Sequence, residues 1–288
     1  MSGSTGAVER SVSRVIAGIN SEDGAGVKLK RSIGQRQNMR IDPFLMLDMF
    51  SSDNPDDYIA GFPPHPHRGF ETVTYMLDGL MLHRDHLGSE GLLRSGGVQW
   101  MTAGRGVIHE ERPQQEDGLM RGFQLWVNLP AADKMKPAAY QNIEPEEVVE
   151  HTTSDGVKLR LVAGTLTLEG VELTGPVQGV TTNPLFVDIA LPPKARISLP
   201  LAAGLSGFAY LFLGAAGLGD QRLTLNAASE LTQGDKVTFT SGDEPARLLL
   251  VAAKPIGEPV VQYGPFVMNT VEEIEQALRD YRDGRLTD

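Results

Sequence analysis

Residues 65–79 read HPHRGFETVTYMLDG, and this stretch decides the fold and the kind of site that we expect. Alternate residues of a β-strand point to the same face, so His65 and His67 can place two imidazoles on one metal ion. The run 72–77 is rich in β-branched and aromatic residues, which predicts a strand. The stretch therefore indicates a pair of metal-ligating side chains at the mouth of a β-barrel.

A second pair of the same kind lies in QWMTAGRGVIHEE, at residues 99–111. His109 and Glu111 again alternate, whereas Glu110 is expected to point away. The chain between the two pairs is long enough for several short strands, so the pairs can meet across a barrel interior. Three neutral imidazoles and one carboxylate suit Fe(II), Mn, Ni, Cu or Co, and they leave open positions on an octahedral ion.

Other interpretations of these residues stay open. A His-x-His pair on an exposed strand is commonly solvated and binds nothing. Glu71 is a rival carboxylate, because on a continuous strand it would point to the same face as His65 and His67. Its alternative role is a structural hydrogen bond or salt bridge. His83 and His86 lie where a strand is expected to run into a turn, and their spacing does not converge there. We expect His83 to order that turn together with Asp85.

The composition narrows the classes of function. The chain has 288 residues, a net charge of -11, six histidines and no cysteine. The absence of cysteine excludes disulfides, thiolate catalysis and Cys-based metal sites. All six histidines lie at or before His151, so a histidine metal site belongs to the first half of the chain. The negative charge argues against direct binding of nucleic acid.

The apolar stretches indicate a folded protein outside the membrane. The N-terminal residues lack the continuous apolar region of a secretory signal. Residues 197–219 carry no charge, but they contain one proline and five glycines, so we expect a strand at 208–213 rather than a spanning helix. Trp100 and Trp126 are expected in the core rather than on a substrate surface. We predict a cytoplasmic protein that does not bind membranes.

Short runs of strand-forming residues, bounded by Gly, Pro, Asn or Asp, recur along the chain. Besides 72–77, they lie at 98–101, 122–128, 159–163, 185–190, 237–240 and 248–253. This spacing predicts an all-β fold of sandwich or barrel type. The polar, proline-containing stretch between 128 and 150 predicts a boundary between an N-terminal metal-binding domain, 1–135, and a C-terminal domain, 136–288.

One helix is expected, at residues 271–282. Thr270 and Glu273 have the spacing of a capping box. Gly284 can end the helix. The residues expected on its apolar face are Ile274, Leu278 and Tyr281.

The quoted motifs resemble those of the pirin family. The H-x-D sequence at residues 83–85 and the C-terminal YGPFVMNTVEEIEQALRDYRDGRL (263–286) are also similar to pirin. The resemblance covers essentially the whole chain and is strongest between 62 and 112. Pirins are bicupins of the cupin superfamily, with two β-barrel domains, and normally only the N-terminal barrel holds a metal, generally iron. The resemblance therefore implies a bicupin with jelly-roll domains, whose C-terminal domain lacks metal ligands and carries the terminal helix.

The resemblance also implies a ligand set. The residues that match the pirin iron ligands are His65, His67, His109 and Glu111. This match favours Glu111 over Glu71, whereas the general cupin pattern uses the glutamate of the first motif, which would be Glu71. Thr102 departs from the general cupin pattern, which has a proline at that place in the second motif.

Pirins resemble quercetin 2,3-dioxygenases in fold and metal shell. The resemblance implies a metal-dependent enzyme, with Fe(II) as the expected ion, that cleaves a flavonol ring with O2 and releases CO. The metal would bind the 3-hydroxyl oxygen of the flavonol as an anion, and Glu111 would accept the proton as a general base. The partners would then be a small aromatic substrate such as a flavonol, and O2.

A non-catalytic function is the alternative. Eukaryotic pirins resemble transcriptional co-regulators that respond to the redox state of iron, and some bacterial relatives bind metabolic enzymes. The chain would then be an iron-dependent, redox-responsive interaction protein, and its acidic charge permits docking on a basic protein partner. A metal that only stabilises the fold is a third interpretation, but structural sites tend to be closed, whereas four ligands leave two octahedral positions open.

Overall fold

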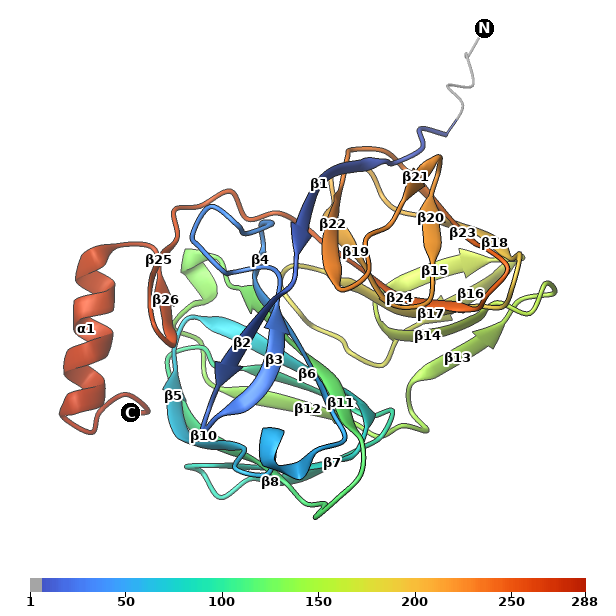
Figure 1. Ribbon diagram of the computed structural model, residues 1–288. Helices are drawn as coiled ribbons and strands as arrows, with labels where there is room; N and C mark the ends of the chain where they lie inside the picture. The colour runs from blue at the N-terminus through green and yellow to red at the C-terminus, as the bar shows by residue number, and fades with distance from the viewer. Residues whose placement is uncertain (1–6) are drawn as a thin grey trace, which may run out of the picture. The chain divides into compact units, whose positions relative to one another are not determined.

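The computed structural model describes residues 7–288 and divides them into two compact units (Figure 1). The first, here called the histidine unit, consists of residues 19–147 and 256–288. The second, here called the companion unit, consists of residues 7–18 and 148–255. Both units are built almost entirely of antiparallel strands, which confirms the predicted all-β, two-domain fold.

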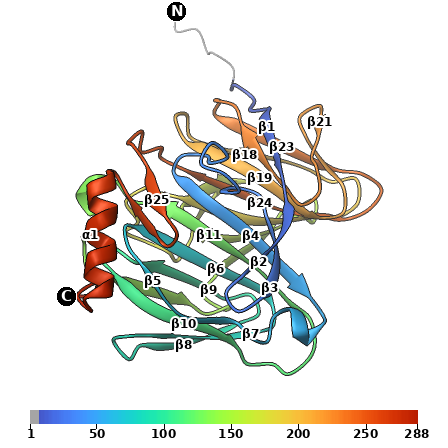
Figure 2. The same cartoon turned by 60° about the vertical axis from the view of Figure 1, so that its left-hand side comes forward.

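The histidine unit contains two main sheets, a hairpin and the helix (Figure 2). Its larger sheet has the strand order β12 (Ala139–Ile143), β9 (Val98–Thr102), β6 (Phe70–Asp78), β11 (Met120–Asn128), β4 (Phe44–Ser52), β3 (Val27–Arg31) and β2 (Ile19–Asp23). Its smaller sheet has the order β5 (Phe62–His67), β10 (Val107–Pro113), β7 (Leu80–Asp85) and β8 (Glu90–Arg94). The other elements are the 3-10 turns η1 (Pro55–Asp57) and η2 (Ala131–Asp133), the hairpin β25 (Val261–Tyr263) and β26 (Phe266–Met268), and α1 (Val271–Arg282).

The companion unit repeats this plan without the helix. Its larger sheet has the order β1 (Val12–Ala17), β22 (Ala227–Leu231), β19 (Ser206–Leu213), β24 (Ala246–Ala253), β17 (Leu185–Leu191), β14 (Lys158–Ala163) and β13 (Val149–Thr152). Its smaller sheet has the order β18 (Arg196–Pro200), β23 (Lys236–Ser241), β20 (Ala216–Leu218) and β21 (Gln221–Arg222), and β15 (Thr165–Leu168) pairs with β16 (Val171–Thr174). Sheets of matching size in both units agree with a duplicated β-domain.

The two ends of the chain correct the predicted domains 1–135 and 136–288. Strand β1 pairs with β22 and so completes the companion unit, although it comes first in the sequence. Helix α1 packs on the hairpin β25–β26 of the histidine unit. The physical reason is hydrophobic burial, because Ile274 and Ala277 of the helix are buried in a cluster that also packs against Ile108 of β10. The terminal helix therefore belongs to the unit with the histidine triad.

The expected strands and helix bounds are confirmed. Every predicted run coincides with a strand, including 208–213, which lies within β19. The capping box of α1 is formed in both directions by Thr270 and Glu273. The apolar face is narrower than expected, because Leu278 and Tyr281 remain substantially exposed. Within residues 7–288, no helix has the length and apolar character needed to cross a membrane.

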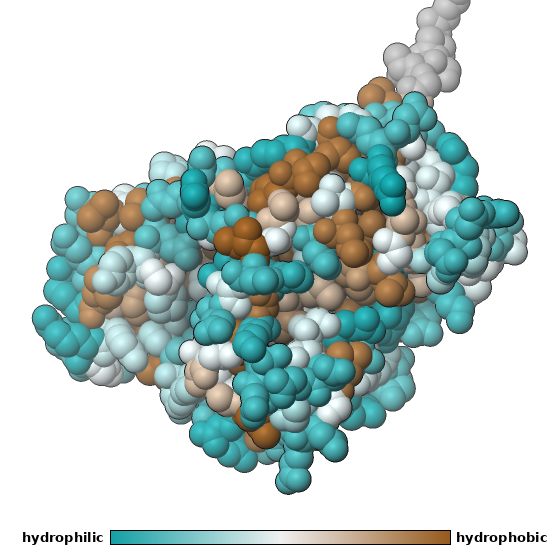
Figure 3. Space-filling model, viewed as in Figure 1, coloured by the Kyte–Doolittle hydropathy of each residue, from teal (hydrophilic) through white to brown (hydrophobic). Residues whose placement is uncertain are grey.

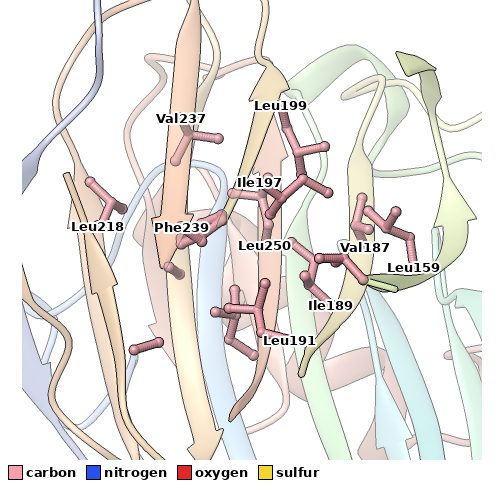
Figure 4. Packing of buried hydrophobic residues seen from close by; sticks show 14 of the residues in the cluster. Leu159, Val187, Ile189, Leu191, Ile197, Leu199, Leu218, Val237, Phe239 and Leu250 are labelled. Atoms are coloured by element: carbon pink, nitrogen blue, oxygen red, sulfur yellow. The ribbon is translucent and has the colours of Figure 1, made fainter. Parts of the chain in front are cut away.

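The interior of the companion unit is filled with aliphatic side chains. Figure 4 shows Ile189 of β17, Ile197 of β18, Phe239 of β23 and Leu250 of β24 gathered in one cluster. All four are at most 5% exposed, and alternate residues of each strand supply this face. Apolar residues thus occupy the barrel interior of this unit, whereas the histidine unit uses part of its interior for imidazoles.

Candidate metal centre

Strands β5 and β10 bring the two predicted pairs together. The strands are antiparallel, with His65 opposite His109 and His67 opposite Val107. The ring centroid of His65 lies 4.3 Å from that of His109 and 4.7 Å from that of His67, and His67 and His109 are 4.9 Å apart. The three imidazoles therefore converge, as the spacing of the sequence predicted.

The nitrogens of this triad fit a metal ion. One ligand atom from each histidine lies within 4.8 Å of the others. His67 Nδ1 and His109 Nε2 are buried and have no hydrogen-bond partner within residues 7–288. His65 Nδ1 lies 2.8 Å from the Pro63 carbonyl oxygen, which leaves its Nε2 available. Buried polar nitrogens are ordinarily hydrogen-bonded, so the unpartnered nitrogens point to a bound ion.

Burial also keeps the three ligands in the protonation state that metals require. Desolvation lowers the pKa of His65, and it lowers the pKa values of His67 and His109 well below the usual range. Each of the latter two is further disfavoured as a cation by the neighbouring imidazoles. Neutral imidazole is the ligating form, so the triad can bind a cation at neutral pH without first losing protons.

Glu111 is buried beside the triad but is not one of the three clustered ligands. A β-bulge follows His109, so that Glu111 pairs with Phe62 of β5. Glu111 Oε1 accepts a hydrogen bond from Thr74 Oγ1 at 3.1 Å. Desolvation raises the pKa of Glu111 to about 7. The carboxyl group can therefore gain or lose a proton near neutral pH, and its role as a fourth ligand stays a prediction.

The rival carboxylate, Glu71, lies on the opposite face of β6 from Thr74, because alternate residues change face. The parity argument for Glu71 is wrong because β5 and β6 are separate strands, joined through Gly69 with φ +92°. Glu71 accepts hydrogen bonds from Thr102 Oγ1 at 2.7 Å and from Trp100 Nε1 at 3.1 Å. Its role is thus the structural one that the sequence left open.

A fourth histidine contacts the triad. His83 on β7 lies opposite Glu111 in the β7–β10 pairing, and its Nε2 is 2.7 Å from His109 Nδ1. The expectation that His83 only orders a turn is therefore wrong, although Asp85 does accept two backbone N–H groups there. The i, i+2 spacing of His83 and Asp85 indicated that their side chains share one face of a strand. The sequence did not reveal that this strand, β7, pairs with β10.

His65 and His67 of the triad line a cavity of about 550 Å³ in the histidine unit. Its apolar wall includes Leu29, Leu45, Met46, Phe50, Phe62 and Trp126. Its polar lining includes Asp23, Arg31, Asp48, Glu111, Gln124 and Gln262, together with His65 and His67. A mostly apolar pocket of this size with a few fixed polar groups is typical of sites for small organic ligands.

Trp126 belongs to the cavity wall, which corrects its assignment to the core. Its ring centroid lies 5.3 Å from that of His67 and 4.3 Å from that of Phe70. Trp126 and Gln124 alternate on β11, so both face the cavity. Trp100 is buried as expected. The sequence could not separate these two roles, since both tryptophans occupy similar strand-like runs.

The turn that follows His67 is built against the C-terminal hairpin. Lys134 Nζ donates hydrogen bonds to the carbonyl oxygens of Gly69 and Val267 and to Asn128 Oδ1, at 2.8, 3.0 and 2.7 Å. A Cβ atom on Gly69 would lie 2.0 Å from the Val267 carbonyl oxygen. The pairing of β5 with β10 is therefore supported by a segment from the far end of the chain.

Two cupin-type β units, one of which carries a histidine triad, define a bicupin protein. The sequence model of the Pirin family matches residues 26–127, and the model of the Pirin C-terminal cupin domain matches residues 186–287. The chain belongs to the pirin family, which confirms the resemblance found in its motifs.

Relatives extend over nearly the full chain. A Pseudomonas aeruginosa protein provisionally named quercetin 2,3-dioxygenase is 51% identical, over 96% of this chain and 98% of its own. Human pirin is 39% identical, over 91% and 89% of the two chains. A crystal structure of quercetin 2,3-dioxygenase from Acinetobacter baumannii superposes with a TM-score of 0.88 at 31% identity, covering 97% of this chain and 99% of that one.

Proposed function

We propose that this chain is a metal-dependent dioxygenase of the quercetin 2,3-dioxygenase type, with Fe(II) as the preferred ion. The observation that carries the proposal is the neutral histidine triad, two members of which, His65 and His67, line a largely apolar cavity. His65, His67 and His109 would hold the ion, with Glu111 as the candidate fourth ligand. When bound, the metal supplies Lewis acidity toward the 3-hydroxyl oxygen of a flavonol and toward O2.

Glu111 is the residue that would hold the substrate proton. Its raised pKa, to about 7, matches the requirement for a general base that works near neutral pH. Thr74 Oγ1 also lies 2.6 Å from Gln124 Oε1, and its single proton can serve only one of the two acceptors. When Glu111 takes up the proton, it can donate to Thr74, which then donates to Gln124. The proton that Glu111 acquires is thus held by a chain of hydrogen bonds through Thr74 to Gln124.

The cavity walls would orient the planar substrate and exclude water. Phe50, Phe62 and Trp126 supply flat apolar surface on three different strands or strand ends. Aromatic rings stack favourably on such side chains. In the overall reaction both atoms of O2 are added to the flavonol, and one ring carbon leaves as CO. A water-poor cavity protects the activated ring from side reactions.

The test is anaerobic reconstitution of the metal-free protein with Fe(II), Mn(II), Ni(II), Co(II) or Cu(II), followed by O2 uptake and CO release with quercetin. We expect turnover with at least one ion, and fastest with Fe(II). The His109→Ala variant should lose both metal and turnover, whereas His86→Ala, at an exposed histidine, should retain both. Stoichiometric metal binding without turnover for any of the five ions would contradict the proposal.

A further inference from the structure

A charged cluster lines the cavity on strands other than those that carry the triad. Arg31 of β3 donates to both carboxylate oxygens of Asp48 on β4, through Nε at 2.8 Å and Nη2 at 2.6 Å. Arg31 Nη2 also donates to Asp23 Oδ2 of β2 at 2.8 Å. All three residues line the same cavity as His65 and His67.

This cluster retains free hydrogen-bonding capacity. Arg31 Nη1 has no hydrogen-bond partner in the described part of the chain, and the side chain of Arg31 is 22% exposed. The Asp23 carboxylate is 48% exposed and accepts, apart from Arg31, only the N–H of Gly24 among residues 7–288. A donor and an acceptor are therefore held side by side at the cavity, and Figure 3 shows mostly polar (teal) residues over β2 and β3.

The companion unit contains an ion pair of the same geometry on its larger sheet. Arg247 of β24 donates to Asp188 of β17 through Nε at 2.9 Å and Nη2 at 2.6 Å. Its guanidinium lies 5.5 Å from the ring centroid of Phe212. A bidentate Arg–Asp pair thus lies on each larger sheet, and in the histidine unit Asp23 and a cavity lie beside that pair. The matched pair provides an internal control for a purely structural role.

We propose that Arg31 and Asp23 form a substrate-recognition subsite that binds a neutral ring hydroxyl on a hydroxylated aromatic substrate. A phenolic hydroxyl is both donor and acceptor, so it can accept from Arg31 Nη1 and donate to Asp23. One guanidinium and two carboxylates give the cluster a net charge of -1 when all are ionised. The subsite therefore selects a neutral hydroxyl over a carboxylate at the same position. This inference rests on the proposed function and narrows its substrate class.

The electrostatic influence of Asp23 reaches the metal site. Its charge opposes the lowering of the His65 pKa by desolvation, and it adds to the raising of the Glu111 pKa by desolvation. A substrate that binds the metal through one oxygen can reach Arg31 and Asp23 with another part of the same molecule, because these residues line the same cavity as His65 and His67. The Asp23–Arg31 pair acts on the bound substrate and takes no part in the chemical step.

The experiment measures flavonol affinity without turnover, in Zn(II)-loaded protein under anaerobic conditions. Two ligand pairs each differ by a single hydroxyl: kaempferol against galangin on one ring, and 3,7-dihydroxyflavone against 3-hydroxyflavone on the other. In the wild type we expect one pair to show a preference of about 10-fold for the hydroxylated ligand. In Arg31→Lys this ratio should fall to about 1, with the affinity for the unsubstituted ligand held within about twofold.

Control variants separate recognition from folding. Arg247→Lys breaks the matched pair and should leave the ligand preference unchanged. Asp23→Asn, at a half-exposed side chain, removes one negative charge. It should raise the affinity for a derivative with a carboxylate in place of the preferred hydroxyl by about 10-fold. Because Asp23 lies at a less buried position than Arg31, this arm is decisive even if Arg31→Lys folds poorly.

The outcomes are distinguishable. Unaltered hydroxyl preference in Arg31→Lys, or no preference in the wild type, would overturn the subsite while leaving flavonol binding, and so the proposed function, intact. A Zn(II)-loaded wild type that binds none of the four flavonols would overturn both. Loss of the preference in Arg31→Lys but not in Arg247→Lys, with the gain for the carboxylate ligand in Asp23→Asn, would support the subsite.

Discussion

His83 Nε2 lies 2.7 Å from His109 Nδ1, and both side chains are buried. One proton lies between these two nitrogens, so the contact fixes the orientation of the His109 ring. The unpartnered His109 Nε2 is thereby directed to the point where the other two imidazoles converge. Hydrogen bonds of this kind behind a ligating histidine are a general means of tuning metal affinity.

The first prediction concerns this contact. His83→Phe should weaken metal binding by about 10- to 100-fold, because His109 loses its orienting partner. His83→Gln retains a polar group and should recover part of the affinity. The measurement is competition for Zn(II) against a chromogenic chelator, with His86→Ala as the exposed control. Equal affinity in His83→Phe and wild type would show that the contact does not position the ligand.

The second prediction concerns the turn after His67. Gly69→Ala should lower the free energy of unfolding by more than about 3 kcal/mol. Alanine is strained at a positive φ, and its Cβ would also clash with the backbone of Val267. Gly69 has φ +92°, and its added Cβ would lie 2.0 Å from the Val267 carbonyl oxygen. Gly88 has a similar φ of +80° but open space around it. Gly88→Ala should therefore cost only about 1 kcal/mol in the same urea titration, and equal losses would contradict the role of the clash.

The third prediction concerns pH. Burial raises the pKa of Glu111 from 4.5 to about 7, so between these values folded protein binds a proton that unfolded protein has lost. This contribution to stability is present at low pH and is lost as pH rises through about 7. In metal-free protein, Glu111→Gln should gain about 2 kcal/mol relative to wild type between pH 5 and pH 8. Parallel pH profiles from urea unfolding would refute the raised pKa.

The fourth prediction concerns Lys134. Its ammonium group satisfies three buried acceptors, and burial lowers its pKa to about 8. Lys134→Met should lower the free energy of unfolding by about 3 kcal/mol, because the acceptors lose their donor. Lys194→Met, at a side chain that is 76% exposed, should change it by less than about 0.5 kcal/mol. Thermal unfolding followed by circular dichroism measures both, and similar shifts in Tm would argue against the buried role.

Much of the fold was predictable from local patterns. Short runs of strand-forming residues bounded by turn signals indicated the strands, and the Thr270–Glu273 spacing indicated the helix start. The assignment of α1 to a domain failed because it depends on the long-range packing of the helix cluster against Ile108. Pairing between distant segments has no signature within either segment alone.

The same distinction applies to the site. The i, i+2 spacing predicted that His65 and His67 share a face, because strand geometry alone aligns such side chains, whereas His109 joins them through the pairing of β5 with β10. The parity argument failed for Glu71, since the turn at Gly69 starts a new strand. Arg31 drew no notice in the sequence because its significance comes from the cavity, which forms only when separate strands close around it.

The N-terminal strand belongs to the companion unit and the C-terminal segment to the histidine unit, and this arrangement has a consequence for synthesis of the protein. Domains tend to fold in order of synthesis, the N-terminal one first. Here the histidine unit requires residues 256–288, and from this segment come Pro265, whose carbonyl oxygen accepts the N–H of Arg68, and Val267, which packs against Gly69. The ligand-bearing strands leave the ribosome early, but their support leaves it last. We therefore expect metal loading to follow release of the finished polypeptide.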